Sequence, residues 1–159
     1  MREAVHASRI HCDVLLLAGT AQVFAEDNHP DVLKGPGEAK WGPAPPVLPK
    51  GVQMMVLSGD PTKSGPFVVR LKLPANTKVP AHHHPMVENI TVISGAFHLG
   101  MGDKLDEKNG TAFEPGGFGS MPANMNHYAW ATADSVIQLH GIGPFKIEYV
   151  NAADDPSKK

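Results

Sequence analysis

The sequence of 159 residues has one cysteine, few aromatic residues and no strong excess of either charge. Cys12 has no partner and matches no metal-ligand spacing, so a disulfide framework is excluded. No apolar run reaches the roughly 18 to 20 residues that a membrane-spanning helix needs. The net charge is −2 and no basic cluster is interleaved with aromatic residues. We therefore expect no membrane span and no nucleic acid partner.

Glycine and proline, in contrast, are abundant, with 16 and 15 residues. Turn-forming residues at this density favour short strands joined by tight turns over long helices. Hydrophobic residues make up 42% of the chain and charged residues 19%, a balance that permits a buried core. The length is typical of one domain.

Residues 1–25 are predicted to be a secretory signal peptide. An apolar core at 14–21 follows a weakly positive start, and Val23-Phe24-Ala25 places small residues where a signal peptidase reads them. Cleavage would leave a periplasmic or secreted chain that begins near Glu26. The alternative is an amphipathic helix that packs on the folded domain, in which case we expect a cytoplasmic protein.

Residues 26–50 are predicted to be a proline- and glycine-rich arm, because five prolines between positions 36 and 49 are incompatible with a helix. Trp41 is expected to anchor this arm to the domain or to a second subunit. At the other end of the chain, residues 151–159 are a polar tail that we expect to be frayed.

From residue 51 to residue 150 the hydrophobic pattern has a period of two, which is typical of strands. In 67–73, for example, Val69, Leu71 and Leu73 share one face. Roughly nine short strands at intervals of about eight to twelve residues predict an all-β barrel or sandwich. A double-sheet jelly roll fits this pattern.

Three expectations concern the second half of this region. Alternate residues of one strand are predicted to fill the core: Phe97, Leu99 and Met101. The charged segment 103–110 is predicted to be a solvated hairpin tip. In the strand that begins at His127, Ala129 and Ala131 are expected to face inward, whereas Tyr128 and Trp130 point outward, into the packing of the other sheet or a dimer interface.

The chemically informative stretch is His82-His83-His84-Pro85-Met86-Val87-Glu88. Because side chains alternate along a strand, His82 and His84 are expected on one face and His83 on the other. Glu88 can return to the first face after the break at Pro85. Two imidazoles and a carboxylate that converge from a rigid sheet are three ligands of a first-row transition-metal site. A fourth ligand is expected from a distant segment.

The candidate for this fourth ligand is His127. The segment 116–127 is predicted to be strand, turn and strand. The turn is placed at Pro122 and Asn124, because proline fixes φ and asparagine tolerates a left-handed backbone. His127 then opens the next strand, where its side chain can reach the other ligands.

These two segments resemble the two sequence motifs of the cupin superfamily. The first motif is complete, at His82, His84, Glu88 and Gly95. The second is matched at Gly116, Pro122 and His127. Asn124 replaces a glycine of the second motif, and Ala131 replaces its final asparagine, which is not a metal ligand in the family. The resemblance covers roughly residues 51–150 and leaves all four ligand positions intact.

The resemblance implies a double-stranded β-helix, the cupin jelly-roll barrel, which here would follow a non-globular N-terminal segment. It also implies one divalent transition metal ion, bound by His82, His84, Glu88 and His127. This donor set favours Mn, Fe or Ni, and also suits Zn, Co or Cu. The sequence has no internal repeat, so we expect one cupin domain. The resemblance and the arm together point to a homodimer.

Three imidazoles and one carboxylate leave up to two open positions on an octahedral ion. A diketone, a 2-hydroxy ketone or a catechol-like pair could chelate there and be polarised. A dioxygenase is the favoured activity. The alternatives are an oxygen-independent isomerase, lyase or decarboxylase at the same site, and a non-enzymatic cupin that binds or senses a small ligand or a metal.

Two other polar residues have alternative predicted roles. Glu88 is predicted to be either a permanent ligand or a general base. Gln138 and His140 share one strand face, and if that face looks inward, His140 is a catalytic proton relay or a substrate contact; otherwise it is a surface or core histidine. His83 and His98 are expected to be dispensable.

Arg70 is the only arginine between residues 51 and 150. A cavity built for phosphate or several carboxylates would need more. The expected substrate is therefore a small neutral carbonyl or aromatic molecule, and Arg70 is expected to be a solvated strand residue.

Overall fold

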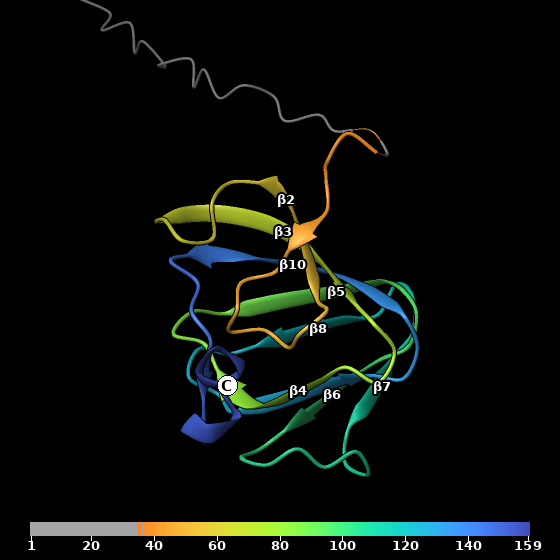
Figure 1. Cartoon of the computed structure of the whole chain (residues 1–159), viewed down its shortest axis with the longest axis vertical. Coiled ribbons are helices and arrows are strands. Elements are labelled where there is room, and N and C mark those ends of the chain that lie inside the picture. The colour runs from red at the N-terminus through yellow and green to blue at the C-terminus, as the bar shows by residue number, and fades with distance from the viewer. Residues whose placement is uncertain (1–34, 36) are drawn as a thin grey trace, which may run out of the picture. The chain divides into compact units, whose positions relative to one another are not determined.

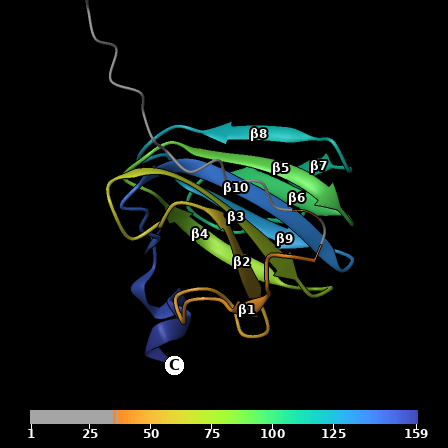
Figure 2. The same cartoon turned by 90° about the horizontal axis from the view of Figure 1, so that it is seen from above.

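The computed structural model describes residue 35 and residues 37–159 of the chain. The predicted signal peptide and the first part of the predicted arm fall outside the described residues, so both stay predictions. The described chain forms two antiparallel β-sheets that face each other (Figures 1 and 2). The predicted all-β jelly-roll architecture is therefore confirmed.

Eleven strands make up these two sheets in the described part of the chain. The first sheet has six strands, in the order β1 (Gly42–Pro43), β2 (Gln53–Ser58), β3 (Gly65–Leu73), β10 (Ser135–Gly143), β5 (Glu88–Ser94) and β8 (Phe118–Met121). The second has five, in the order β11 (Glu148–Tyr149), β4 (Lys78–His83), β9 (His127–Ala131), β6 (Phe97–Met101) and β7 (Thr111–Phe113). Strands distant in the sequence are thus neighbours in each sheet.

The core lies between the two sheets and follows the predicted alternation. In β3, Val69, Leu71 and Leu73 are buried, whereas Arg70 and Lys72 are not. Fifteen buried residues from both sheets and from the segment before β2 form one cluster. Burial of alternate apolar side chains on each sheet stabilises this sandwich, since apolar area removed from water contributes about 25 cal/mol per Å².

The turn glycine that closes the first motif is required by geometry. Gly95 has a φ of +90°, in the left-handed region where a side chain is strained. A Cβ there would also lie 2.4 Å from the carbonyl oxygen of Asp134. Only glycine can therefore join β5 to β6 in this way. Asn124, which replaces the glycine of the second motif, has a φ of +60°, as expected for its turn.

Tyr128 and Trp130 point away from the main core, as predicted, and are covered within the same chain. They are 1% and 4% exposed because the segment 103–110 of the same chain lies over them. The Tyr128 hydroxyl donates to the carbonyl oxygens of Asp106, at 3.2 Å, and Asn109, at 2.6 Å. This segment is the hairpin tip that was predicted, and most of its residues are exposed, but Leu105 in it also packs against a second small core.

Two further predictions were wrong, one at the end of β6 and one at the end of the chain. Met101 is 52% exposed, because β7 pairs only with the first three residues of β6 and leaves its end uncovered. The tail is not frayed over 152–158, where it forms two short 3₁₀-helices, η1 (Ala152–Asp154) and η2 (Pro156–Lys158). Asn151 and Asp155 cap them by accepting hydrogen bonds from backbone N–H groups.

The described part of the arm is attached to the sandwich. Its β1 pairs with β2 at the edge of the six-stranded sheet, with Gly42 opposite Met54. Ala44 and Leu48 pack against the core, whereas the Trp41 side chain is exposed. Within the described chain, the arm is therefore anchored by Ala44 and Leu48 rather than by Trp41.

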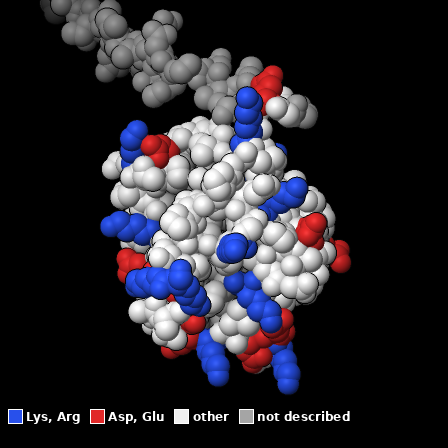
Figure 3. Space-filling view, in the orientation of Figure 1, with Lys and Arg blue, Asp and Glu red and all other residues white. Residues whose placement is uncertain are grey.

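The surface carries charges of both signs. On the face drawn in Figure 3, acidic side chains lie among the Lys and Arg side chains, and uncharged surface separates most of them. Among the described residues, no helix is both long and apolar enough to cross a membrane.

Candidate metal centre

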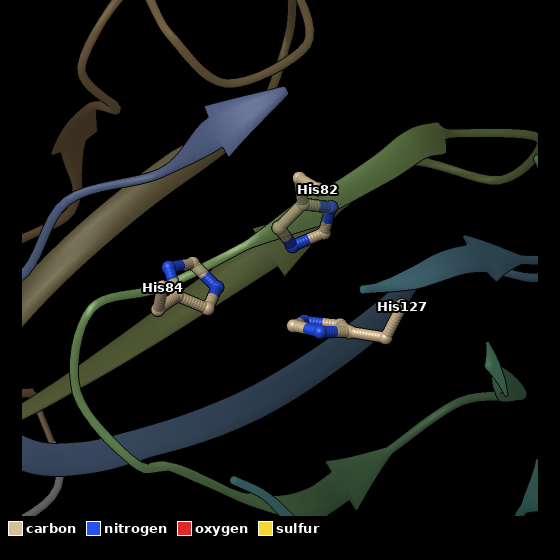
Figure 4. A group of neighbouring side chains, drawn as sticks. All are labelled: His82, His84 and His127. Atoms are coloured by element: carbon tan, nitrogen blue, oxygen red, sulfur yellow. The ribbon is translucent and has the colours of Figure 1, made fainter. Parts of the chain in front are cut away.

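Three histidines from two neighbouring strands meet at one end of the five-stranded sheet. His82 lies in β4, His84 follows the end of this strand, and His127 is the first residue of β9. The register places His82 directly opposite His127. One ring nitrogen from each residue lies within 4.8 Å of the other two, and the three rings surround a common space (Figure 4). The predicted convergence of these histidines is what the structure shows.

The second nitrogen of each ring donates to a backbone carbonyl. His82 Nδ1 bonds to the Pro80 oxygen at 2.7 Å and His127 Nδ1 to the Met125 oxygen at 2.9 Å. His84 Nδ1 bonds to the Lys146 oxygen at 2.6 Å. A carbonyl oxygen can only accept, so the hydrogen of each neutral ring is on Nδ1. Each Nε2 therefore has a free lone pair.

These Nε2 lone pairs fit a metal ion. The three histidines are 1% to 4% exposed. The Nε2 atom of His84 has no hydrogen-bond partner among the described residues, and that of His127 faces the Glu88 carboxylate. A buried polar atom without a partner destabilises a fold by about 1–3 kcal/mol. An ion in the common space would satisfy these nitrogens, and hydrogen bonds from the far ring nitrogen to backbone carbonyls are the usual support for metal-bound histidine.

Glu88 approaches the same space from the other sheet. It is the first residue of β5 and is 5% exposed. Its Oε2 lies 3.2 Å from His127 Nε2 and its Oε1 lies 3.5 Å from His84 Nε2. The carboxylate can therefore complete a coordination shell or stand beside it as a base.

Burial and mutual repulsion keep two of the histidines neutral. Burial lowers the pKa of His82 to about 3, with added repulsion from His127 and His84. Burial also lowers the pKa of His84 and outweighs the attraction of Glu88. Neutral imidazole is the form that binds metals, so both rings are ready to do so across the physiological pH range.

Glu88 and His127 shift each other's pKa in the metal-free site. Burial alone would lower the pKa of His127, but the Glu88 carboxylate outweighs burial and raises it. Burial alone would raise the pKa of Glu88, but the three neighbouring imidazoles outweigh it and the pKa is lowered. Without a metal, the carboxylate of Glu88 and the imidazole of His127 each favour the charged form of the other. A divalent ion would likewise favour the charged carboxylate.

A cavity of about 430 Å³ opens from the four residues into the space between the sheets. Most of its wall is aliphatic, from strands of both sheets, and includes Leu71, Leu99 and Leu139. Ala129 also lines it, as predicted. Apart from the four site residues, only three lining residues have polar side chains: Thr62, Lys146 and Glu148. The cavity suits a mostly apolar molecule with one polar end.

His140 does not belong to this site, and its predicted catalytic role was wrong. In the first half of β10 the buried residues are Ser135, Ile137 and Leu139, so Gln138 and His140 project from the opposite face of the sheet. On that outer face Arg70 donates to the Gln138 side chain at 3.1 Å. Alternation fixes which residues share a face, and here the apolar set occupies the inner one.

The other two histidines in the described part of the chain lie elsewhere, as predicted. His83 points away from the site and lies 3.4 Å from the Glu148 carboxylate. His98 stacks on Trp130, with ring centroids 4.8 Å apart. Neither ring lines the cavity.

Several residues that contact the histidines were missed at the sequence level. Phe145 stacks on His84, with ring centroids 4.2 Å apart, and the Tyr149 ring lies 5.9 Å from that of His82. Lys146 contributes the carbonyl oxygen that orients His84. The alternation of Phe145, Ile147 and Tyr149 was a usable signal, because it indicates one apolar face in this segment.

Comparison with known proteins agrees with this geometry. The ChrR cupin-like domain matches residues 29–146, well over half of the chain. No curated protein sequence matches this chain. The polyketide cyclase RemF from Streptomyces resistomycificus is 17% identical, with a TM-score of 0.62 over 76% of this chain and 86% of that one.

Two further solved structures share the fold. A putative acetylacetone dioxygenase from Methylibium petroleiphilum PM1 is 20% identical, with a TM-score of 0.56 over 74% of this chain and 79% of that one. An RmlC-like cupin from Shewanella frigidimarina is 12% identical, with a TM-score of 0.56 over 70% of this chain and 90% of that one. At these identities the likeness concerns the fold, and the domain match gives the family. The chain is a cupin and belongs to the ChrR cupin-like domain family.

Proposed function

We propose that this cupin is a metal-dependent dioxygenase that acts on a small neutral carbonyl or aromatic molecule. His82, His84 and His127 would hold one divalent transition metal ion, with Mn, Fe or Ni favoured by the donor set. The observation that carries the proposal is the set of three buried Nε2 lone pairs, each fixed by a hydrogen bond from Nδ1 to a backbone carbonyl.

When bound, the ion would polarise a chelating substrate and, if it is redox-active, permit reaction with dioxygen. The protein would contribute orientation, a largely apolar cavity and a base. The aliphatic wall excludes water from the polar end of a bound molecule. The fold is compatible with this proposal, since one protein that shares it is described as a putative acetylacetone dioxygenase.

Glu88 supports a second candidate, an oxygen-independent isomerase, lyase or decarboxylase. A buried carboxylate 3.2 Å from a histidine nitrogen of the site can remove a proton from a chelated carbonyl compound. If Glu88 is a base, Glu88→Gln should retain the metal and lose turnover by about 100-fold or more. If Glu88 is a permanent ligand, the same variant should bind metal more weakly than the wild type.

The proposal is tested first by the metal content of protein purified without a His tag. We expect close to one ion per chain by elemental mass spectrometry, and a loss of affinity of about ten- to a hundredfold or more in His82→Ala. His83→Ala is the matched control, because this neighbour lies in the same strand but points away, and it should retain metal. Full metal content in His82→Ala would refute the role of that residue.

The identity of the metal then separates the two reactions. Iron or nickel would support the dioxygenase and call for oxygen-consumption assays with diketones and catechols. Manganese or zinc would support the oxygen-independent candidate. No metal in wild type, even after reconstitution, would refute both and leave a ligand-binding cupin.

A further inference from the structure

One wall of the cavity does not come from the barrel strands that hold the metal site. The loop between β1 and β2 contributes Pro45, Val47, Leu48 and Pro49 to the lining. Figures 1 and 2 place this loop on the same side of the molecule as the C-terminal segment. We call residues 45–49 the arm wall.

The arm wall is held in a defined shape. Three prolines in five residues restrict its backbone. The Leu48 N–H donates to the Pro45 carbonyl at 2.9 Å, and the Val52 N–H donates to the Pro49 carbonyl at 3.2 Å. Leu48 packs against the core and reaches the cavity. The wall therefore presents a fixed apolar surface to any molecule in the cavity.

Tyr149 connects this wall to the metal centre. Its hydroxyl donates to the carbonyl oxygen of Val47 at 2.7 Å, across 102 positions of the sequence. Its ring lies 5.9 Å from the His82 ring, and its strand, β11, pairs with β4, with Tyr149 opposite His82. A displacement of the arm wall would therefore move Tyr149, and with it the surroundings of the candidate ligand His82.

The cavity has few charged side chains with which to distinguish one substrate from another. Lys146 and Glu148 are the only charged lining residues besides Glu88, and both are exposed. The remaining lining comes mainly from strands fixed by sheet hydrogen bonds, with further residues from the loop between β2 and β3 and from the segment before β11. Molecules that share a chelating end would therefore be distinguished mainly by the bulk and shape of their apolar part.

We propose that the arm wall determines substrate specificity by limiting the bulk of the apolar group opposite the chelating end, and that Tyr149 is the residue that positions it. This inference rests on the proposed function, because it names the part of the same site that selects the substrate. Leu48 is the main selecting side chain, since it both packs on the core and lines the cavity.

Two probes with the same chelating end test this inference. Their affinities for the metal-loaded protein are measured by anaerobic titration calorimetry, with 2,4-pentanedione as the small probe and 1-phenyl-1,3-butanedione as the bulky one. In Leu48→Ala the ratio of affinities should shift toward the bulky probe by about tenfold or more, an effect of the size expected for a reshaped apolar pocket. Ile142→Ala is the matched control, because Ile142 is exposed and lies outside the cavity lining.

The positioning role is tested by Tyr149→Phe, which removes only the hydroxyl. The ratio should shift in the same direction by about fivefold, the effect of one hydrogen bond. Tyr128→Phe is the control, because it removes a similar hydroxyl-to-carbonyl hydrogen bond at a site that does not line the cavity. Identical ratios in Leu48→Ala and Ile142→Ala, or in the two tyrosine variants, would overturn the inference.

A metal-free measurement separates this inference from the proposed function. In the metal-free protein, 1-phenyl-1,3-butanedione should shift the methyl NMR signals of Val47 and Leu48 and leave that of Ile142 unchanged. If wild type fails to bind metal but the probe still shifts these signals, the arm wall is supported and the metal-dependent reaction is refuted. If wild type binds metal but the probe leaves the signals of Val47 and Leu48 unchanged, the arm wall is refuted and the proposed reaction stands.

Discussion

At the residue scale, the three histidines differ in how their second ring nitrogen is held. His82 and His127 each bond to a carbonyl two residues earlier in the sequence. His84 bonds to a carbonyl 62 positions away, in the segment that leads to β11. Local backbone geometry therefore orients two of the rings, whereas the third depends on how the C-terminal segment packs. The Phe145 ring stacked on His84 adds to that dependence.

The buried His82 predicts how the stability of the metal-free protein depends on pH. Its pKa is about 3 in the folded state, against an ordinary value of 6.5. Below pH 6.5 the unfolded chain thus binds a proton that the folded chain does not, so stability is lost as pH falls toward 3. Between pH 7 and pH 5 this residue should lower the free energy of unfolding by about 2 kcal/mol.

Urea unfolding of metal-free wild type and His82→Gln at both pH values measures this effect. Glutamine does not titrate, so the difference in unfolding free energy between the two proteins should change by about 2 kcal/mol between pH 7 and pH 5. The comparison cancels the opposite effect of His127, whose raised pKa favours the folded state at low pH. The same pH dependence in both proteins would contradict the prediction.

At the scale of elements, the cover formed by 103–110 depends on the absence of a side chain in β6. Gly100 lies against the Tyr128 ring, and a Cβ there would be 2.2 Å from a ring carbon. The ring cannot move away freely, because its hydroxyl is bonded to Asp106 and Asn109. The covering segment and the sheet below it are therefore packed as one unit.

We predict that Gly100→Ala lowers the free energy of unfolding by about 1–3 kcal/mol, the usual effect of overpacking a core. Urea unfolding measures it. Gly42→Ala in β1 is the matched control, since a Cβ there would have no neighbour within 4 Å, and it should change stability by less than about 0.5 kcal/mol. Equal stability of the two variants would show that the covering segment yields to make room.

At the scale of the whole molecule, the candidate site joins the two sheets. The histidines come from the five-stranded sheet and the segment after β4, and Glu88 comes from the six-stranded sheet. An ion bound by all four would link the sheets in the folded state and have no comparable site in the unfolded chain. Metal binding should therefore stabilise the fold.

We predict that removing the metal with a chelator lowers Tm by roughly 5 to 10 °C, as measured by calorimetry or circular dichroism. An ion at about 100 times its Kd stabilises by about 2.7 kcal/mol, and each kcal/mol shifts Tm by about 2 to 4 °C at this chain length. His83→Ala should show the same shift and His127→Ala should lose it. A Tm unaffected by the chelator in wild type would contradict this prediction.

The sequence by itself determined the architecture and the candidate ligands. Alternation of apolar residues predicted the strands, because the side-chain period of a strand is fixed at two. The spacing of His82, His84 and Glu88, with His127 far along the chain, predicted a site that the folded sheets bring together. Local rules were sufficient to place these four residues, because each lies at a fixed position of its own strand or turn, whereas the orientation of the His84 ring depends on the C-terminal segment.

Tertiary structure alone decided which face of a strand points inward and which distant segments contact each other. Alternation showed that Gln138 and His140 share a face, but not that this face looks outward, because inward and outward are defined only by the opposing sheet. The contact between Tyr149 and Val47 links segments 102 positions apart, and the cover over Tyr128 and Trp130 comes from a charged segment. No local pattern encodes such pairings, since they depend on the packing of the complete chain.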